Sequence, residues 1–275
     1  MLIMKLYGKK LIIMYSKEHK DYIKKIKRHR IFILVAQISI ILIFLILWQY
    51  LANKNFINTF ITSSPKKIIE TIYNLYISNN LFKHIWITIY ETIISFSLGT
   101  LIGLVIASIL WWNRNLAEIL DPYLTILNSL PKVALGPIII IWVGAKTSSI
   151  IIMALLISSI IAIINIYEGF NNIDKIKINM FKSFKASKWQ IYKMLILPSS
   201  ITNIMNVIKV NISMSLIGVI MGEFLVSKEG IGYLITYGSQ VFNLNLVMTG
   251  ILLLSLLATV MYYLSNLITK KILDH

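Results

Sequence analysis

The sequence predicts an all-α, polytopic membrane protein with about six transmembrane helices. Of its 275 residues, 57% are apolar and only 14% are charged, and the mean hydropathy of +0.76 exceeds what a single soluble core requires. The apolar residues fall into runs of about 20, the length that crosses the hydrocarbon core of a bilayer. These runs leave room only for tails and loops, which excludes a fused ATPase domain or a soluble enzyme of ordinary size.

The charge and the absence of cysteine exclude several further classes of site. Lys and Arg number 27 and Asp and Glu 11, a net charge of +16. The basic residues cluster at predicted membrane edges, so the expected counter-charge is membrane lipid and no nucleic acid is expected as a partner. With no cysteine and four scattered histidines, disulfides, thiol nucleophiles and common zinc sites are excluded. No cofactor or metal is therefore expected on this chain.

Two regions are expected along the chain. Residues 1–30 form a basic tail, in which Met14 is an alternative start, and residues 31–275 form the membrane domain. The first span, Ile31 to Asn53, is too long for a signal-peptide core. In the next segment, Ser64 before Pro65 predicts the start of an interfacial amphipathic helix with Ile68, Ile69, Ile72 and Leu75 on one face.

The second and third spans differ in character. Thr92 to Asn113 carries Gly99 and Gly103 at a four-residue interval, which predicts close packing against another helix. The third span, Leu124 to Val143, is interrupted by Pro131 and Pro137, and such a break has to face protein rather than lipid. Three polar or helix-breaking residues at its inner end are candidates for lining a translocation pathway: Asn128, Ser129 and Pro131.

Three further spans complete the prediction, and the basic residues give their orientation. The spans are Thr147 to Tyr167, Ile201 to Val226 and Leu246 to Ile268. With the N-terminus inside, the inner side holds twenty Lys and Arg and the outer side six. Because cytoplasmic loops retain Lys and Arg, both termini and the long loop 168–198 are expected in the cytoplasm of a multi-pass cell-membrane protein.

The loop 168–198 is expected to form an elbow of two helices. Ile173, Ile176, Met180 and Phe184 fall on one face of a short amphipathic helix. Ser187 then opens a second helix with the Ser-x-x-Gln pattern of a capping box, and that helix is expected to end at Pro198. An alternative is a basic surface helix on anionic lipid, which explains the lysines but not the capping box.

This loop resembles the EAA loop of ABC importer permeases, written E-A-A-x3-G-x9-I-x-L-P. Asn179, Met180 and Phe181 stand at the E-A-A positions and Lys185 stands at the Gly. The stretch Ser183-Phe-Lys-Ala-Ser187 is similar to the S-L-G-A-S form of the nitrate/sulfonate/taurine-type branch. Other stretches that resemble this branch are Ser63-Ser-Pro65, Asn128 to Pro137, Gly222-Glu-Phe-Leu225, Glu229-Gly-Ile-Gly-Tyr-Leu234, and Leu195, Leu197 and Pro198 at the end of the loop.

The resemblance implies the type I ABC importer permease fold and a transport subunit with no catalysis of its own. It implies a separate ABC ATPase that binds ATP-Mg, an extracellular or periplasmic substrate-binding protein, and a permease homodimer. The cargo implied is a small solute of the nitrate, sulfonate or taurine kind, or a vitamin precursor. The residues implied to couple to the ATPase are Asn179, Met180, Phe181, Ser183, Lys185, Ala186, Ser187 and Pro198.

Two residues depart from the pattern for which the loop is named. Asn179 supplies no negative charge, and Lys185 favours helix where Gly would permit a kink. The replacement of Gly by Lys185 affects the expected corner between the two helices, and the replacement of Glu by Asn179 affects the expected pairing with the ATPase.

Glu223 stands out as an acidic residue deep in a span, where a charge costs about 2.5 to 3.5 kcal/mol. Either it pairs with Lys146 or Lys228, or it lies beside the translocation pathway. The neighbouring Gly218 and Gly222 are expected to pack closely at a dimer axis. The interfacial anchors expected from composition are Trp111, Trp112 and Trp142.

Two other classes of membrane protein fit the sequence less well. A secondary transporter or channel should show repeated halves or several ionisable groups inside the membrane, and only Glu223 fits. A membrane enzyme needs a nucleophile, a metal cluster or a carboxylate pair near one face, and the sequence pattern offers none.

Overall fold

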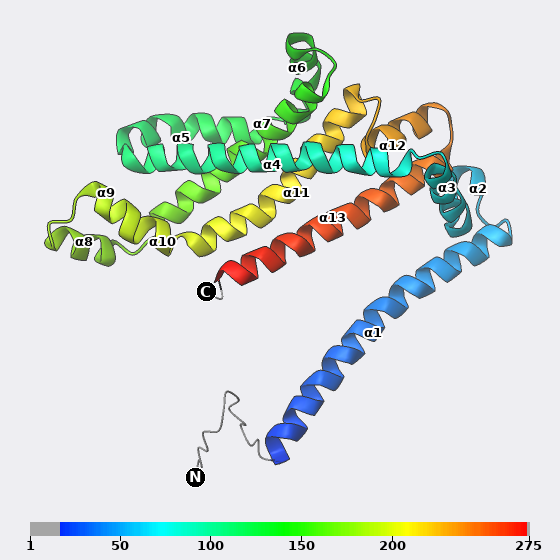
Figure 1. The fold of residues 1–275 in the computed structure, drawn as a ribbon, viewed down its shortest axis with the longest axis horizontal. Coiled ribbons are helices and arrows are strands. Elements are labelled where there is room, and N and C mark those ends of the chain that lie inside the picture. The colour runs from blue at the N-terminus through cyan, green and yellow to red at the C-terminus, as the bar shows by residue number, and fades with distance from the viewer. Residues whose placement is uncertain (1–16, 274–275) are drawn as a thin grey trace. The chain divides into compact units, whose positions relative to one another are not determined.

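The computed structural model describes residues 17–273, which form helices joined by short turns with no β-strand among them. Five helices are long and apolar enough to cross a bilayer, and a bent pair supplies a sixth crossing or a re-entrant loop. The predicted all-α membrane fold is confirmed (Figure 1). The five helices are α1 (Lys17–Asn53), α4 (Leu81–Trp112), α7 (Thr147–Asn171), α11 (Ile201–Val226) and α13 (Leu244–Leu273).

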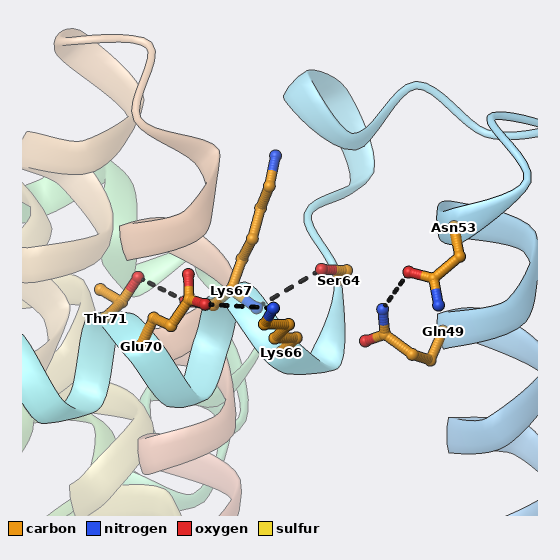
Figure 2. A network of polar contacts seen from close by, with 7 residues as sticks. All are labelled: Gln49, Asn53, Ser64, Lys66, Lys67, Glu70 and Thr71. Carbon is orange, nitrogen blue, oxygen red and sulfur yellow. Dashed lines mark hydrogen bonds and ion pairs between the residues drawn. The ribbon is translucent and has the colours of Figure 1, made fainter.

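Helix α1 belongs to a unit of its own, which ends at Thr59. It begins at Lys17, so the basic residues from Lys17 to Arg30 are helical and continuous with the first span. Met1 and Met14 lie outside the described residues. At the last turn of α1, Gln49 Nε2 donates to Asn53 Oδ1 at 2.7 Å (Figure 2).

The second unit starts at Phe60, inside the short helix α2 (Thr59–Thr62), and continues with the amphipathic helix α3 (Pro65–Ile77). Ser64 caps α3 as predicted, because its side chain accepts a hydrogen bond from the Lys67 N–H at 3.4 Å (Figure 2). The Lys66–Glu70 ion pair and the bond from Thr71 Oγ1 to the Lys67 carbonyl support its exposed face. One expectation was wrong: Ile69 is 68% exposed, whereas Ile68 is buried.

Helices α4, α7 and α11 pack against one another and form the centre of the second unit (Figure 1). A Cβ at Gly103 would meet Ala162 of α7, and one at Gly99 would meet Ser158. The glycines of α11 do the same further along α7: Gly218 abuts Ala154, and Gly222 abuts Ile150. The expectation of a dimer axis at Gly218 and Gly222 is therefore wrong, because α7 of the same chain occupies that face.

The third crossing is more irregular than the sequence suggested. It consists of α5 (Arg114–Ser129), the 3₁₀ turn η1 (Lys132–Leu135) and α6 (Gly136–Val143), with a bend of 86°. Asn113 starts α5 by accepting from the Leu116 N–H at 3.1 Å. Pro131 lies at the break, but Pro137 lies in the first turn of α6, where proline is favoured, so it starts a helix instead of interrupting one.

The remaining elements cap the two ends of the bundle. Helix α13 packs on α3, α11 and α12. In Figure 1, α8 and α9 lie at one end and α12 lies at the other. The bounds are α8 (Lys175–Ser183), α9 (Lys188–Ile191), the π-helical turn η2 (Tyr192–Ile196), α10 (Leu197–Ser199) and α12 (Ile231–Gln240).

Candidate functional site

The segment 174–198, called the elbow below, begins with α8. Asp174 caps this helix by accepting from the Ile176 N–H at 2.8 Å. Three apolar side chains of α8 and its end point away from the protein: Ile176 is 75% exposed, Met180 52% and Phe184 79%. Ile173, expected on the same face, instead packs against the core. The elbow thus presents an apolar face for which the described chain provides no cover.

The other side of α8 holds it to the bundle. Ile178 and Phe181 are partly buried against the core cluster that includes Phe170, Ile196 and Val207. Asn179 is exposed, and its carbonyl accepts from Ser183 Oγ at 3.1 Å. The amphipathic helix is therefore anchored on one side and open on the other.

The corner after α8 is a Schellman motif. The Ala186 N–H bonds the Phe181 carbonyl at 3.1 Å, and the Lys185 N–H bonds the Lys182 carbonyl at 2.8 Å. Lys185, the donor of the second bond, has a φ of +56°, which is the left-handed conformation that glycine adopts most easily. The chain therefore forms a sharp corner although Lys185 replaces the Gly of the EAA pattern. Lys185 itself adopts the left-handed conformation that the corner requires.

The second half of the elbow is fixed by the predicted capping box. The Gln190 N–H donates to Ser187 Oγ at 3.3 Å, and the Ser187 N–H donates to Gln190 Oε1 at 2.7 Å. Pro198 does not end this helix, contrary to the prediction. It lies in the first turn of α10, directly after the π-helical turn η2, where the wider register accommodates its missing N–H.

A cavity of about 310 Å³ lies along the elbow. It separates the exposed face of α8 from the α9 segment and is largely apolar. Its lining residues are Met180, Phe181, Phe184, Ala186, Gln190 and Met194.

At the opposite end of the bundle, side chains of α4 and α11 bind the first turn of α12. The buried carboxylate of Glu223 accepts from Thr88 Oγ1 at 2.6 Å and from the Gly232 N–H at 2.5 Å. Thr88 Oγ1 accepts in turn from the Ile231 N–H at 2.9 Å. His84 Nδ1 accepts from the Gly230 N–H at 2.9 Å. Three amides that a helix start leaves unpaired are thereby satisfied by neighbouring helices.

The glycines of this network give the carboxylate room. Gly230 has a φ of +100°, and a Cβ on Gly232 would lie 2.7 Å from Glu223 Oε2. Neither Lys146 nor Lys228 forms an ion pair with Glu223 in the described part of the chain, so the pairing considered for it was wrong. The positive end of the α12 dipole takes the place of a cation.

Glu91 is a second buried acidic residue that the sequence reasoning did not place in the core. It is 1% exposed, and its carboxyl group lies close enough to Glu223 to interact with it. Neither of its oxygens meets hydrogen-bond geometry with a described residue. His84, Thr88 and Glu91 were missed because α4 starts at Leu81, well before the predicted start at Thr92.

The other pathway candidates do not join these networks. Asn128, Ser129 and Pro131 lie at the bend between α5 and η1, and all three are exposed. The Asn128 carbonyl accepts from Lys132 Nζ at 2.8 Å, and Ser129 Oγ donates to the Thr125 carbonyl at 2.9 Å. These are local bonds of a bent crossing.

Residues 99–274 match the family described as the binding-protein-dependent transport system inner membrane component. The chain belongs to this family. It is thus a multi-pass permease component of an ABC importer, and the alternatives of a secondary transporter, a channel or a membrane enzyme are set aside. The family predicted from the loop motif is confirmed.

Individual relatives agree with this membership. A probable ABC transporter permease protein of Haemophilus influenzae is 25% identical over 230 residues, covering 84% of this chain and 93% of that protein. The putative aliphatic sulfonates transport permease protein SsuC of Bacillus subtilis is 26% identical over 227 residues, covering 82% of each. A solved inward-facing structure of the MetNI methionine ABC transporter shares the fold, with a TM-score of 0.63, 19% identity and coverage of 74% and 98%.

Proposed function

We propose that the elbow is the element through which this permease docks on its ABC ATPase. The observation that carries the proposal is the exposed apolar face of Ile176, Met180 and Phe184 on a segment held rigid by a Schellman motif and a capping box. Exposed apolar side chains on a rigid support favour burial against a partner. ATP-Mg would bind to the ATPase, and the resulting closure of the ATPase would move the elbow.

The test uses the full chain co-expressed with its ATPase. In the double variant Met180→Asp and Phe184→Asp, co-purification of the ATPase should fall at least tenfold, because two charges would be buried at the contact. Asn172→Asp, an exposed neutral-to-acidic change at the end of α7, is the matched control and should leave the yield unchanged. Full retention of the ATPase by the double variant would refute the docking role.

We also propose that both termini and the elbow are cytoplasmic, as the distribution of basic residues predicts. Because the natural chain has no cysteine, a single Asn172→Cys variant, exposed at the start of the loop and outside the proposed docking face, can be labelled without background. A membrane-impermeant maleimide should label it in inverted vesicles and not in intact cells. Labelling in intact cells would reverse the orientation.

With this orientation, α3 and α12 lie on the outer side, where a substrate-binding protein would deliver its solute. An open cavity of about 490 Å³ lies between α3 and the start of α13, lined by polar side chains that include Thr71, Asn74, Asn243 and Asn245. We expect Asn74→Trp to reduce binding-protein-stimulated uptake at least threefold, while Lys66→Trp, outside the cavity lining, leaves it unchanged. Equal uptake by both variants would move the docking surface elsewhere.

The cargo proposed is a small sulfonate-type anion or a related solute, supported by the sulfonate permease among the relatives. The functional unit proposed is a pair of these chains with two ATPases. Calorimetric titration of the partner binding protein with alkylsulfonates tests the first proposal, and the mass of the purified complex tests the second. Absence of any heat signal with sulfonates would direct the search to another solute class.

A further inference from the structure

We propose that Lys188 and Tyr192 form a joint that transmits the movement of the elbow to helix α4. This inference rests on the proposed docking of the elbow and adds the path by which the stroke leaves it. The joint comprises Ser108, Trp111 and Trp112 at the end of α4, together with Lys188 and Tyr192.

Lys188 attaches the first residue of α9 to the C-terminus of α4. Its Nζ donates to the backbone carbonyl of Trp112, the last residue of α4. The same ammonium lies 5.8 Å from the ring centroid of Trp111 and 5.5 Å from that of Trp112. A cation at a helix C-terminus satisfies an unpaired carbonyl and the negative end of the dipole, and the two rings add cation–π attraction.

Tyr192 attaches the next turn of the elbow to the same helix. It is buried, and its hydroxyl lies 2.6 Å from Ser108 Oγ. Ser108 Oγ already donates to the Leu104 carbonyl at 2.6 Å, so Tyr192 is the donor to Ser108. The Tyr192 ring contacts Trp111 with centroids 5.3 Å apart and stacks on Trp189 at 5.9 Å. The two rings expected as lipid-interface anchors, Trp111 and Trp112, therefore pack on the elbow.

The joint is separate from the docking face. Ile176, Met180 and Phe184 are exposed on α8, whereas Lys188 and Tyr192 follow the corner. Between them, the Schellman motif and the capping box hold α8 and α9 at a fixed angle. A displacement applied to α8 therefore moves Lys188 and Tyr192 with it, and these residues move the end of α4.

Helix α4 then reaches the other end of the bundle. Its 32 residues span about 48 Å. Near its start, Thr88 and His84 bind the first turn of α12, which Glu223 also binds. One rigid helix therefore connects the joint at the elbow to the hydrogen bonds that position α12.

The competing explanation is that the joint only stabilises the fold. Both explanations predict some loss of uptake, so total activity does not separate them. The number of solute molecules taken up per ATP hydrolysed does, because a loosened joint lets the ATPase turn over without moving the pathway.

The experiment compares variants reconstituted with their ATPase and binding protein. Lys188→Met removes the ammonium but keeps the apolar stem, and Tyr192→Phe removes only the hydroxyl. We expect ATPase co-purification within twofold of the unmodified chain and an uptake per ATP at least threefold lower, with the double variant lower still. Lys188→Arg should restore most of the ratio, and Lys193→Met, an exposed lysine of the same segment, should not change it.

A second measurement follows the movement itself. Asn80→Cys places a single thiol at the exposed start of α4, and its labelling rate should change when ATP and vanadate are added. In the Lys188→Met background that change should disappear while the ATPase remains bound. An unchanged uptake per ATP, or a preserved nucleotide response of Asn80→Cys, overturns the joint. Failure of the unmodified chain to bind an ATPase would instead refute the docking proposal.

Discussion

Gly232 donates its backbone N–H to the buried carboxylate of Glu223 over 2.5 Å, and so joins the first turn of α12 to the end of α11. The other oxygen of Glu223 accepts from Thr88 of α4. One carboxylate therefore holds three helices together. This arrangement explains why a residue so costly in a membrane-spanning helix sits where it does.

Replacing this carboxylate by an amide should destabilise the protein. In Glu223→Gln the amide can accept from only one of these two donors. Its NH₂ group then faces either the Gly232 N–H, which is left unpaired, or the Thr88 hydroxyl, which has to donate instead to the His84 carbonyl at 3.3 Å. We expect a loss of about 1 to 3 kcal/mol in the free energy of unfolding, measured by denaturant titration in mild detergent.

Glu229→Gln is the control, because Glu229 forms an exposed ion pair with Lys83 at 2.5 Å. Exposed pairs contribute about 0 to 1 kcal/mol, so this variant should change stability much less. Equal losses in the two variants would mean that the carboxylate of Glu223 has no special role in binding α12.

The strained corner of the elbow predicts a stabilising substitution. Lys185 has a φ of +56°, and glycine adopts this conformation without the Cβ penalty. Lys185→Gly should stabilise the chain by about 1 kcal/mol, whereas Lys182→Gly inside α8 should destabilise it by about 1 kcal/mol. Thermal unfolding and the rate of proteolysis at the elbow measure both; a loss of stability in Lys185→Gly would contradict the Schellman geometry.

The contact between α11 and α7 predicts a difference between two glycines. A Cβ at Gly218 would lie 2.5 Å from the backbone Cα of Ala154, whereas a Cβ at Gly250 would meet the side chain of Ile235, which can rotate away. Gly218→Ala should cost about 1 to 3 kcal/mol and Gly250→Ala clearly less. Denaturant titration of both variants tests this order, and the reverse order would place the helices further apart than described.

The capping box predicts non-additivity. Ser187→Ala should cost about 1 kcal/mol, and Gln190→Ala should also destabilise because it removes the reciprocal bond. Since the two bonds share the same residues, the double variant should lose less than the sum of the single losses. Strictly additive losses, measured by thermal unfolding, would indicate that the two bonds form independently.

Features set by neighbouring residues could be predicted from the sequence. Ser64 before Pro65 and Ser187 with Gln190 are caps whose partners lie within three residues, and both form as expected. The apolar runs and the small-residue stripe of α4 were also found, because hydrophobic length and four-residue spacing are local signals.

Features set by distant residues could not be predicted. Glu223 pairs with Thr88, 135 positions away, and nothing near Thr88 marks it as a partner. The presence of Gly218 indicated that another helix packs closely against α11. It did not indicate that this helix is α7 of the same chain, which contacts Gly218 through Ala154. One signal could have indicated the contact between Glu223 and α12. Gly230-Ile-Gly232 follows Glu223 by seven residues, and two glycines allow a side chain to approach the backbone closely.

The direct contacts of α4 with α11 and α12 also constrain how the chain is made. Thr88 and Glu91 emerge from the ribosome more than a hundred residues before Glu223 and the amides of α12 that they face. During that interval α4 carries polar groups with no native partner inside the bilayer. We therefore expect nascent α4 to be retained beside the insertion machinery, and released into lipid only after α11 has been synthesised.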